Sequence, residues 1–390
     1  MAGILETPYG TRDFLPKEAA AKRAIENRLA ALFAEFGYEE VVTPTMEFLE
    51  TLTVSDRTLE PNLFKMFDQQ NRTLALHHEM TTPIARLAVS RLKDSPLPLK
   101  LSYNTSVFRF RQNQPGRQCE FYQAGVELLG VSNAFADAEI IALAANGLKA
   151  AGLKNFTICL GQVEFANGLM EQNSLSAAAK SEIKSAIERH DIVGLKKIVD
   201  GLNLDEAAAN SLKKIPKLHG GIEILDVARG LAENDKSQRA LNNLAEIYAL
   251  AESYGVAENI AFDLGIIRDF EYYTGMVFEA YAPDVGYTLA GGGRYDHMLK
   301  DFGLACPATG FALGIERILL ACERQGILAD VRARDIYLSY GEGNADAAIK
   351  KAQELRAAGK VVELSLMAQT RDAAEKSQTA KGYGELIYLG

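Results

Sequence analysis

The chain has 390 residues, of which 48% are hydrophobic and 24% are charged, and its formal net charge at pH 7 is −9. This length predicts two or three domains, and the composition is that of an ordinary globular protein. The acidic balance argues against a polyanion as the main partner, although it leaves a local basic groove open. No apolar run reaches the roughly 18 residues of a membrane span, and the opening MAGILETPYGTRDFLP lacks a signal-peptide block. We therefore expect a cytoplasmic protein that contacts no membrane.

Cysteine and histidine usage predicts no metal site. The cysteines are far apart and form no CxxC or Cys/His pattern, so we expect them to be reduced and mostly in the core. They are Cys119, Cys159, Cys306 and Cys322. His77 and His78 are neighbours, but no second cluster completes a ligand set.

The first half of the chain mixes helix and strand signals. Apolar residues at helical spacing follow Pro16 and predict a helix. EEVVTPTMEF reads as a strand in which Pro44 must lie at an edge or a contact point, because proline cannot donate to a ladder. LKLSYNTSVFRF and CEFYQAGVELLG predict a strand pair joined by a polar loop, and a helix at 134–150 follows.

The second half changes character twice. Residues from about 167 to 256 are rich in Ala, Leu, Lys and Glu with helical periodicity and no strand signal, which predicts a helical insertion. From about 331 the order strand–helix–strand–helix–strand predicts a small α/β domain with a parallel sheet. We therefore expect an α+β fold: an antiparallel sheet with flanking helices over 1–325, interrupted by the insertion, and the small domain over 331–390.

Several common catalytic motifs are missing from the sequence. It contains no GxxxxGK[ST], GxSxG or HExxH, and AGGGRYD at 290–296 lacks the spacing of a dinucleotide site. The glycines of that stretch fit close backbone approach to a ligand or a tight turn.

A set of polar residues interrupts the apolar alternation of the predicted sheet. Gln123 and Glu127 are four residues apart on one strand and so share a face, and Glu79 and Thr81 directly precede a helix. The others are Arg109, Arg117, Arg268, Tyr273 and Arg317. Each alone fits a surface salt bridge, but together they predict a pocket. Its carboxylates would hold an amine or an imidazole N–H, and its guanidiniums would hold anionic oxygens.

These segments resemble the catalytic domain of class II aminoacyl-tRNA synthetases, and specifically the histidyl-tRNA synthetase family. GTRDFLP is similar to that family's opening signature and FGYEEVVTPTMEF to its first motif. VFRFRQNQPGRQCEFYQAGVELLG resembles the second motif and GFALGIERILL the third, while IRDFEYYTGMVFEAY and AGGGRYDHML resemble the histidine signatures. The resemblance covers about residues 5 to 325 and implies the class II synthetase fold, with the tail as a shortened anticodon-binding domain.

The resemblance also implies roles for individual residues. The position matching Glu79 meets the α-amino group of histidine, with Thr81 beside it. Gln123, Glu127, Tyr273 and its neighbour Tyr272 match positions that line the imidazole, and Arg268 matches the one that reaches the carboxylate. Arg109, Arg117 and Arg317 match positions that hold the ATP phosphates.

The nucleotide half departs from the synthetase pattern. The second motif of a synthetase reads Phe-Arg-x-Glu, whereas here Phe108 and Arg109 are followed by Phe110 and Arg111. This change removes an acceptor and places a cation where Mg²⁺ would approach. HHEMTTP also replaces the usual Pro-Glu-Gly-Thr core, and the tail is short. These departures resemble the regulatory-subunit family of ATP phosphoribosyltransferase.

That resemblance implies a regulatory protein with no catalytic residues, no cofactor and no tRNA partner. It would activate the short-form catalytic subunit of ATP phosphoribosyltransferase and mediate feedback inhibition by L-histidine in the first step of histidine biosynthesis. We expect a homodimer within a hetero-oligomer, a hetero-octamer. An active histidyl-tRNA synthetase and a free-standing histidine sensor are the alternatives, and the sequence leaves open whether histidine acts in this pocket or between subunits.

Overall fold

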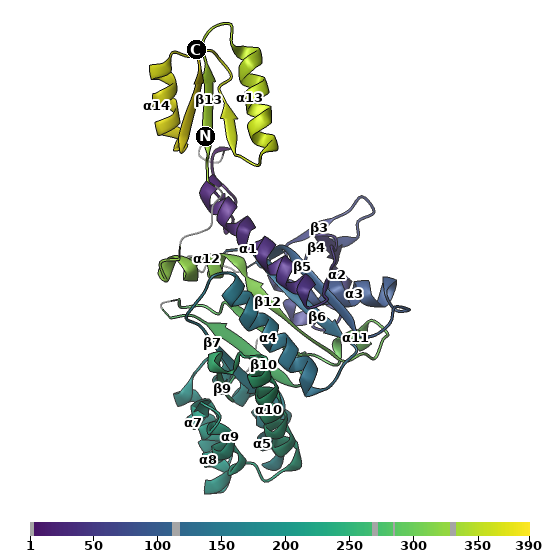
Figure 1. Cartoon of the computed structure of the whole chain (residues 1–390). Helices are drawn as coiled ribbons and strands as arrows, with labels where there is room; N and C mark the ends of the chain where they lie inside the picture. The colour runs from purple at the N-terminus through teal and green to yellow at the C-terminus, as the bar shows by residue number, and fades with distance from the viewer. Residues whose placement is uncertain (1–3, 111–117, 267–271, 284, 328–332) are drawn as a thin grey trace. The chain divides into compact units, whose positions relative to one another are not determined.

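The computed structural model describes residues 4–110, 118–266, 272–283, 285–327 and 333–390 (Figure 1). The chain divides into two compact units, Met1–Ala329 and Asp330–Gly390. In the described ranges, no helix is both long enough and apolar enough to cross a membrane.

The first unit is organised around a mixed sheet whose strand order is β1-β5-β6-β12-β11-β10-β7-β9-β8. Its strands are β1 (Glu39–Glu40), β5 (Leu99–Phe108), β6 (Glu120–Leu129), β7 (Thr157–Gln162), β8 (His219–Gly220), β9 (Ile260–Asp263), β10 (Met276–Tyr281), β11 (Ala290–Arg294) and β12 (Ala308–Gly314). Pairs β1–β5 and β7–β9 are parallel, and the other neighbours in this sheet are antiparallel. The α+β prediction is confirmed, with these two parallel pairs as an addition.

The two faces of the sheet carry different cores, as the alternation in β6 predicts. Ala124, Val126 and Leu128 belong to the larger core, which packs against one set of helices. These helices are α1 (Pro16–Glu35), α4 (Ala134–Ala150) and α12 (Ile315–Arg324). On the opposite face, Leu129 joins a smaller core together with α3 (Thr81–Arg91) and α11 (Met298–Asp301). Gln123 and Glu127 lie on this second face.

The predicted strand EEVVTPTMEF is wrong as one continuous element. It divides into β1 and β2 (Met46–Phe48), and β2 leaves the main sheet to pair with β4 (Thr73–Leu76). β4 also pairs with β3 (Lys65–Phe67) to complete a small sheet. Pro44 lies at the break, because it has no N–H for a ladder, and its carbonyl lies 3.2 Å from Nδ1 of His77. Short helical turns α2 (Leu49–Leu52) and η2 (Arg57–Asn62) separate β2 from β3.

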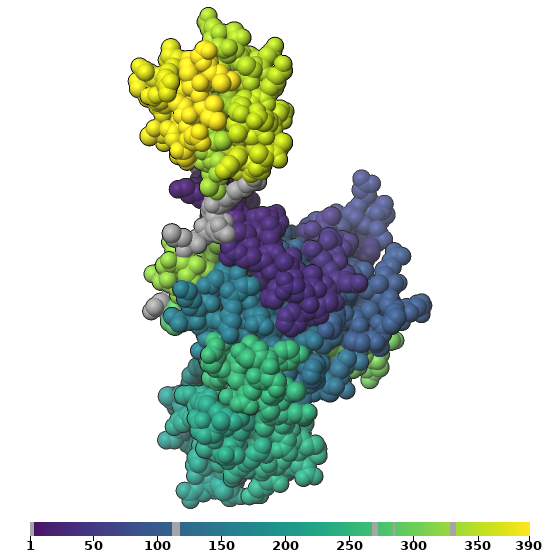
Figure 2. Space-filling view, in the orientation of Figure 1, coloured from purple at the N-terminus to yellow at the C-terminus, as the bar shows by residue number. Residues whose placement is uncertain are grey.

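The inserted segment is helical, and polar residues cap several of its helices. The helices are α5 (Val163–Gln172), α6 (Ala177–Glu188), α7 (Ile192–Asp200), α8 (Glu206–Lys214), η3 (Ile215–Lys217), α9 (Ile224–Arg229), α10 (Asp235–Ser253) and η4 (Ala257–Asn259). The side chains of Ser176, Asp191, Asp205 and Asn234 accept backbone N–H groups at the starts of α6, α7, α8 and α10. Figure 2 shows the atoms of this segment, in teal to green, gathered into one body. The prediction that this segment contains no strand is wrong, because the two-residue β8 pairs with β9 and extends the sheet.

The second unit is a three-stranded parallel sheet of order β14-β13-β15, as its strand–helix alternation predicts. Its elements are β13 (Ile336–Tyr340), α13 (Ala345–Ala357), β14 (Val362–Leu364), α14 (Arg371–Lys381) and β15 (Glu385–Leu389). Figure 1 shows α13 and α14 flanking the strands. Its core of buried residues is small: Ile336, Leu338, Ala348, Ala352 and Val362.

Because this core is small, one truncation should unfold the second unit selectively. Leu338 is completely buried, so Leu338→Ala should destabilise the unit by ~3 kcal/mol. We expect faster hydrogen exchange across 333–390, measured by mass spectrometry, and unchanged exchange in the first unit. Leu366→Ala is the matched control, because Leu366 is 95% exposed and its truncation should change neither. Equal exchange in the two variants would contradict the prediction.

Candidate functional site

Glu127 is the centre of the candidate site on the second face of the sheet. Its side chain is only 2% exposed and is held by two hydroxyl donors. Thr81 Oγ1 donates to Oε1 at 2.9 Å, and the Tyr295 hydroxyl donates to Oε2. Burial raises the pKa of Glu127 to about 8, and the negative charge of Glu79 adds to this while the two hydroxyls oppose it. The site therefore holds a carboxyl group that titrates near neutral pH.

Glu79 places a second carboxylate beside the first. Its Oε2 accepts the backbone N–H of Thr81 at 2.6 Å, and its Oε1 accepts that of Thr82 at 2.9 Å. These are the first N–H groups of α3, so Glu79 caps this helix, and the helix dipole favours its negative charge. Both acidic side chains are thus fixed at the start of α3, Glu79 through the backbone and Glu127 through the Thr81 hydroxyl.

Glycines on two neighbouring strands make room for the side chains of the site. Gly310 pairs with Glu127 in the ladder, and a Cβ atom at Gly310 would overlap the Glu127 carboxylate. Gly293 pairs with Gly310, and a Cβ atom there would lie 2.9 Å from the ring of Tyr273. The carboxylate and the phenol ring can therefore lie over adjacent strands. The glycines of AGGGRYD act here by admitting neighbouring side chains and strands.

Three tyrosines form one wall beside the carboxylates. The ring centroids of Tyr272 and Tyr273 are 4.8 Å apart, and those of Tyr272 and Tyr295 are 5.8 Å apart in an edge-on arrangement. Burial, together with the charge of Glu127, raises the pKa of Tyr295 well above its usual value. Tyr295 therefore keeps its proton and acts as a donor.

The two described arginines of the predicted nucleotide half are held by neighbouring groups. Arg109 Nε donates to the His78 carbonyl oxygen at 2.9 Å, and its guanidinium lies 5.2 Å from the centre of the Phe121 ring. Arg317, on α12, is exposed and donates to the carbonyl oxygen of Thr288 at 2.6 Å and to its hydroxyl at 2.9 Å. Both cations thus have protein acceptors in this structure.

Apart from Arg109 and Arg317, the predicted site residues fall into three groups. Glu79, Thr81 and Glu127 are linked by hydrogen bonds. The Tyr272 ring lies against that of Tyr295, and the Tyr273 ring lies over Gly293, so both belong to the same group. Gln123 is half-buried on the same face, opposite Gly314 at the start of α12. Arg117 and Arg268, like Arg111, lie outside the described residues.

Sequence reasoning missed Tyr295 and Gly310 as residues of the site. Tyr295 is part of AGGGRYD, where an aromatic residue directly after a glycine-rich strand was the available signal. Gly310 could not be recognised without the strand register that places it opposite Glu127.

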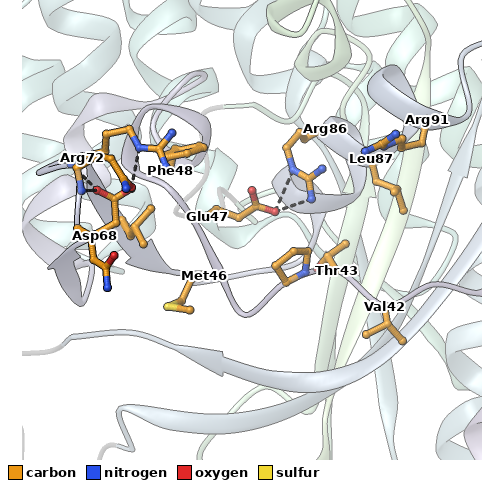
Figure 3. Close-up of a pocket in the computed structure, with 14 residues that line it drawn as sticks. Val42, Thr43, Met46, Glu47, Phe48, Asp68, Arg72, Arg86, Leu87 and Arg91 are labelled. Atoms are coloured by element: carbon orange, nitrogen blue, oxygen red, sulfur yellow. Dashed lines mark hydrogen bonds and ion pairs between the residues drawn. The ribbon is translucent and has the colours of Figure 1, made fainter.

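A separate groove of about 760 Å³ lies between β2, the β3–β4 hairpin and α3 (Figure 3). Its lining residues are Val42, Thr43, Pro44, Met46, Glu47, Phe48, Asp68, Gln69, Gln70, Arg72, Leu74, Arg86, Leu87 and Arg91. Arg86 donates from both Nε and Nη2 to Oε1 of Glu47, at 2.9 and 2.6 Å. Val42 is 88% exposed and Met46 50% exposed, so the groove offers apolar surface to the solvent.

The fold and the site define a histidyl-tRNA-synthetase-like protein. The family model described as histidyl-tRNA synthetase matches residues 10–318. The solved histidyl-tRNA synthetase of Nostoc sp. PCC 7120 has the same fold, with a TM-score of 0.83 at 20% identity, over 97% of this chain and 90% of that one.

More similar relatives define the family further. The ATP phosphoribosyltransferase regulatory subunit of Moorella thermoacetica is 43% identical over 97% of this chain and 96% of its own length. That of Symbiobacterium thermophilum is 41% identical over 99% of this chain and 97% of its own. A structure from Bacillus halodurans C, titled ATP phosphoribosyltransferase regulatory subunit/histidyl-tRNA synthetase, has a TM-score of 0.90 at 35% identity and covers 99% and 98% of the two chains. The chain belongs to the family of ATP phosphoribosyltransferase regulatory subunits.

The raised pKa of Glu127 predicts a pH-dependent stability. A carboxyl group in the unfolded chain titrates near 4.3, so between about pH 4.3 and 8 the folded chain keeps a proton that the unfolded chain releases. The free energy of unfolding should therefore fall as the pH rises through this window and then level off. The side chain in Glu127→Gln is neutral at every pH, so the variant avoids the cost of a buried charge. Its melting temperature should therefore exceed that of the wild type by a few degrees at about pH 8, and by less at about pH 5.

Thermal unfolding followed by circular dichroism across this window tests the prediction. Glu246→Gln, at an exposed position on α10, is the control and should give the same difference from wild type at every pH. A Glu127→Gln difference that does not change with pH would show that Glu127 does not titrate in the window.

Proposed function

We propose that this regulatory subunit binds L-histidine in the pocket of Glu79, Thr81, Glu127 and Tyr273. Without histidine it activates the short-form catalytic subunit of ATP phosphoribosyltransferase, and with histidine bound it inhibits that subunit. Gln123, Arg268 and Tyr272 complete the amino-acid site in this proposal. The observation that carries it is the pair of buried carboxylates beside an aromatic wall.

The chemistry of this pair favours a small ligand with two donor groups. Glu79 is 5% exposed and Glu127 2% exposed, so each is desolvated and gains from a cationic or N–H partner. Each carboxylate oxygen has a second lone pair, so the bonds to α3 and to the hydroxyls leave acceptor capacity. An α-amino group at Glu79 and an imidazole N–H at Glu127 would use this capacity. A ligand that lacks one of these groups would bury a carboxyl group further without supplying the donor that compensates for its lost hydration, which would make the site selective.

The nucleotide half supports a regulator better than an enzyme. Arg109 and Arg317, the retained cations, already donate to carbonyl oxygens of the protein. Arg111 stands where the synthetase motif has a carboxylate, and its positive charge would repel Mg²⁺. The alternative, an active histidyl-tRNA synthetase, is favoured only by the presence of Arg109 and Arg317. In our proposal the protein carries no catalytic residues, needs no cofactor and binds no tRNA.

We propose that the groove of Figure 3 is part of a homodimer interface within a cytoplasmic hetero-octamer. The exposed apolar side chains of Val42 and Met46 line it, and those of Phe48 and Phe67 are 40% and 73% exposed on the same small sheet. Several exposed apolar side chains on one small element are typical of a protein–protein contact. The catalytic subunits would then dock on the dimer.

Calorimetric titration with L-histidine tests the binding site. We expect wild-type protein to bind and Glu79→Gln to bind at least about tenfold more weakly, because an amide cannot neutralise the α-ammonium group. Glu246→Gln should bind as the wild type does. Equal affinities for wild type and Glu79→Gln would place histidine elsewhere.

Enzyme assays separate the two candidate functions. The purified chain with histidine, ATP and Mg²⁺ should give no ATP–pyrophosphate exchange, whereas exchange at synthetase rates would favour the alternative. Added to the short catalytic subunit, the chain should raise phosphoribosyltransferase activity, and histidine should reverse this. Wild-type inhibition by histidine in the Glu79→Gln complex would contradict the proposed site.

Sedimentation tests the interface. Val42→Glu places a charge on a side chain that we expect to be buried between copies, so it should shift dimers to monomers. Leu366→Glu is the control, because it also adds a charge at a highly exposed leucine but lies in the second unit. An unchanged sedimentation coefficient for Val42→Glu would exclude this part of the groove from the interface.

A further inference from the structure

Arg294 forms a buried hydrogen-bonded centre on the face of the sheet opposite the carboxylates. Its Nε and Nη2 donate to the two carboxylate oxygens of Asp137 on α4, at 3.0 and 2.8 Å. Its Nη1 donates to the Val131 carbonyl oxygen and to Asp296 Oδ1, both at 3.0 Å, and Nη2 reaches the Asn133 carbonyl at 3.5 Å. The residue is 6% exposed. All five N–H groups of the guanidinium thus have acceptors.

The backbone around Arg294 holds the segment that carries Tyr273. The Thr274 N–H donates to the Arg294 carbonyl oxygen at 2.8 Å. The Thr274 hydroxyl accepts the Asp296 N–H at 3.0 Å, and Asp296 is itself paired with Arg294. Gly275 lies so close that a Cβ atom there would be 3.1 Å from Arg294 Cδ. Thr274, which directly follows Tyr273, is therefore bonded to the backbone of residues 294 and 296, and the guanidinium is linked to this backbone through the Asp296 carboxylate.

The same centre fixes Tyr295, which follows Arg294 in the chain. The Tyr295 N–H donates to the Ala308 carbonyl at 2.8 Å, and the Ala308 N–H donates to Asp296 Oδ1 at 3.1 Å. Successive residues of a strand point to opposite faces, so Arg294 reaches α4 while Tyr295 reaches Glu127. The guanidinium thus lies on the α4 face and is linked to the backbone on both sides of Tyr295 through Asp296 Oδ1, which also accepts the Ala308 N–H.

We propose that Arg294, held by Asp137, is a positioning residue that sets Tyr273 and Tyr295 against Glu127 and so determines the affinity of the effector site. This inference rests on the proposed histidine site and names a residue for it that does not contact the ligand. Lysine cannot replace arginine here, because its three donors cannot serve acceptors that are arranged for a planar fork.

The experiment compares Arg294→Lys with wild-type full-length protein in two readouts. In calorimetry, Arg294→Lys should bind L-histidine about tenfold more weakly. The double variant Arg294→Lys/Tyr295→Phe should lose less binding free energy than the sum of the losses in the two single variants, because both changes remove the same contact to Glu127. The matched control is Ile141→Val, which removes core packing on the same helix as Asp137 and should leave histidine affinity unchanged.

The second readout needs no ligand. The Tyr295 hydroxyl opposes the raised pKa of Glu127, so its displacement should extend the fall in stability to pH values above about 8. Melting temperatures measured across pH should show this extension in Arg294→Lys and not in Ile141→Val.

Thr274→Val serves if Arg294→Lys fails to fold, because it removes only the hydroxyl that joins Thr274 to Asp296 and should also weaken histidine binding. Unchanged affinity, additive losses and an unchanged pH profile would overturn the inference. If wild-type protein does not bind histidine, the proposed function fails, and the pH profile alone then decides the role of Arg294.

Discussion

The constraint that shapes the first unit is the burial of two carboxyl groups close together. An ionised carboxylate in a protein interior needs donors or opposite charge, and a second carboxylate nearby increases the cost. The structure meets this need with short-range donors: two N–H groups of α3 at Glu79, and two hydroxyls at Glu127. These donors come from α3 and from the residue after β11, and the carboxyls from β6 and the turn before α3. Elements far apart in the sequence must therefore pack correctly before the pair is stable.

The two faces of the sheet divide this work. The smaller core around α3 and α11 carries the carboxyls, tyrosines and glycines, whereas the larger core around α1 and α4 supplies apolar packing. Arg294 connects the two, because it is on the strand between Gly293 and Tyr295 yet pairs with Asp137 on α4. A change in the position of α4 would reach the face that carries the carboxyls through this strand, although the buried residues of α4 belong to the larger core on the other face.

The sequence was sufficient for the elements whose signal is local. The alternation in β6 located Gln123 and Glu127 on one face, Pro16 opened α1, and the tail read as a parallel sheet. Features that depend on register or tertiary pairing were not predictable. The break at Pro44 sends β2 to a different sheet, and β8 is too short to leave a pattern. Gly310 matters only because it pairs with Glu127, and Tyr295 only because its hydroxyl reaches that carboxylate. In each case the missing information was a partner distant in the chain.

The predicted amino-acid residues and the predicted nucleotide residues differ in how strongly the fold depends on them. Glu79 caps α3 and Glu127 organises Thr81 and Tyr295, so loss of either would leave buried N–H or O–H groups unpaired. Arg317, in contrast, is exposed, donates to Thr288 and lies 5.8 Å from the centre of the Tyr287 ring at the surface of the unit. Arg109 donates to the backbone carbonyl of His78, and a carbonyl oxygen has a second lone pair with which it can accept another donor if this one is lost. The fold thus depends on an acceptor at positions 79 and 127, although the raised pKa means that the negative charge of Glu127 itself lowers stability, and it depends far less on the exposed guanidinium of Arg317.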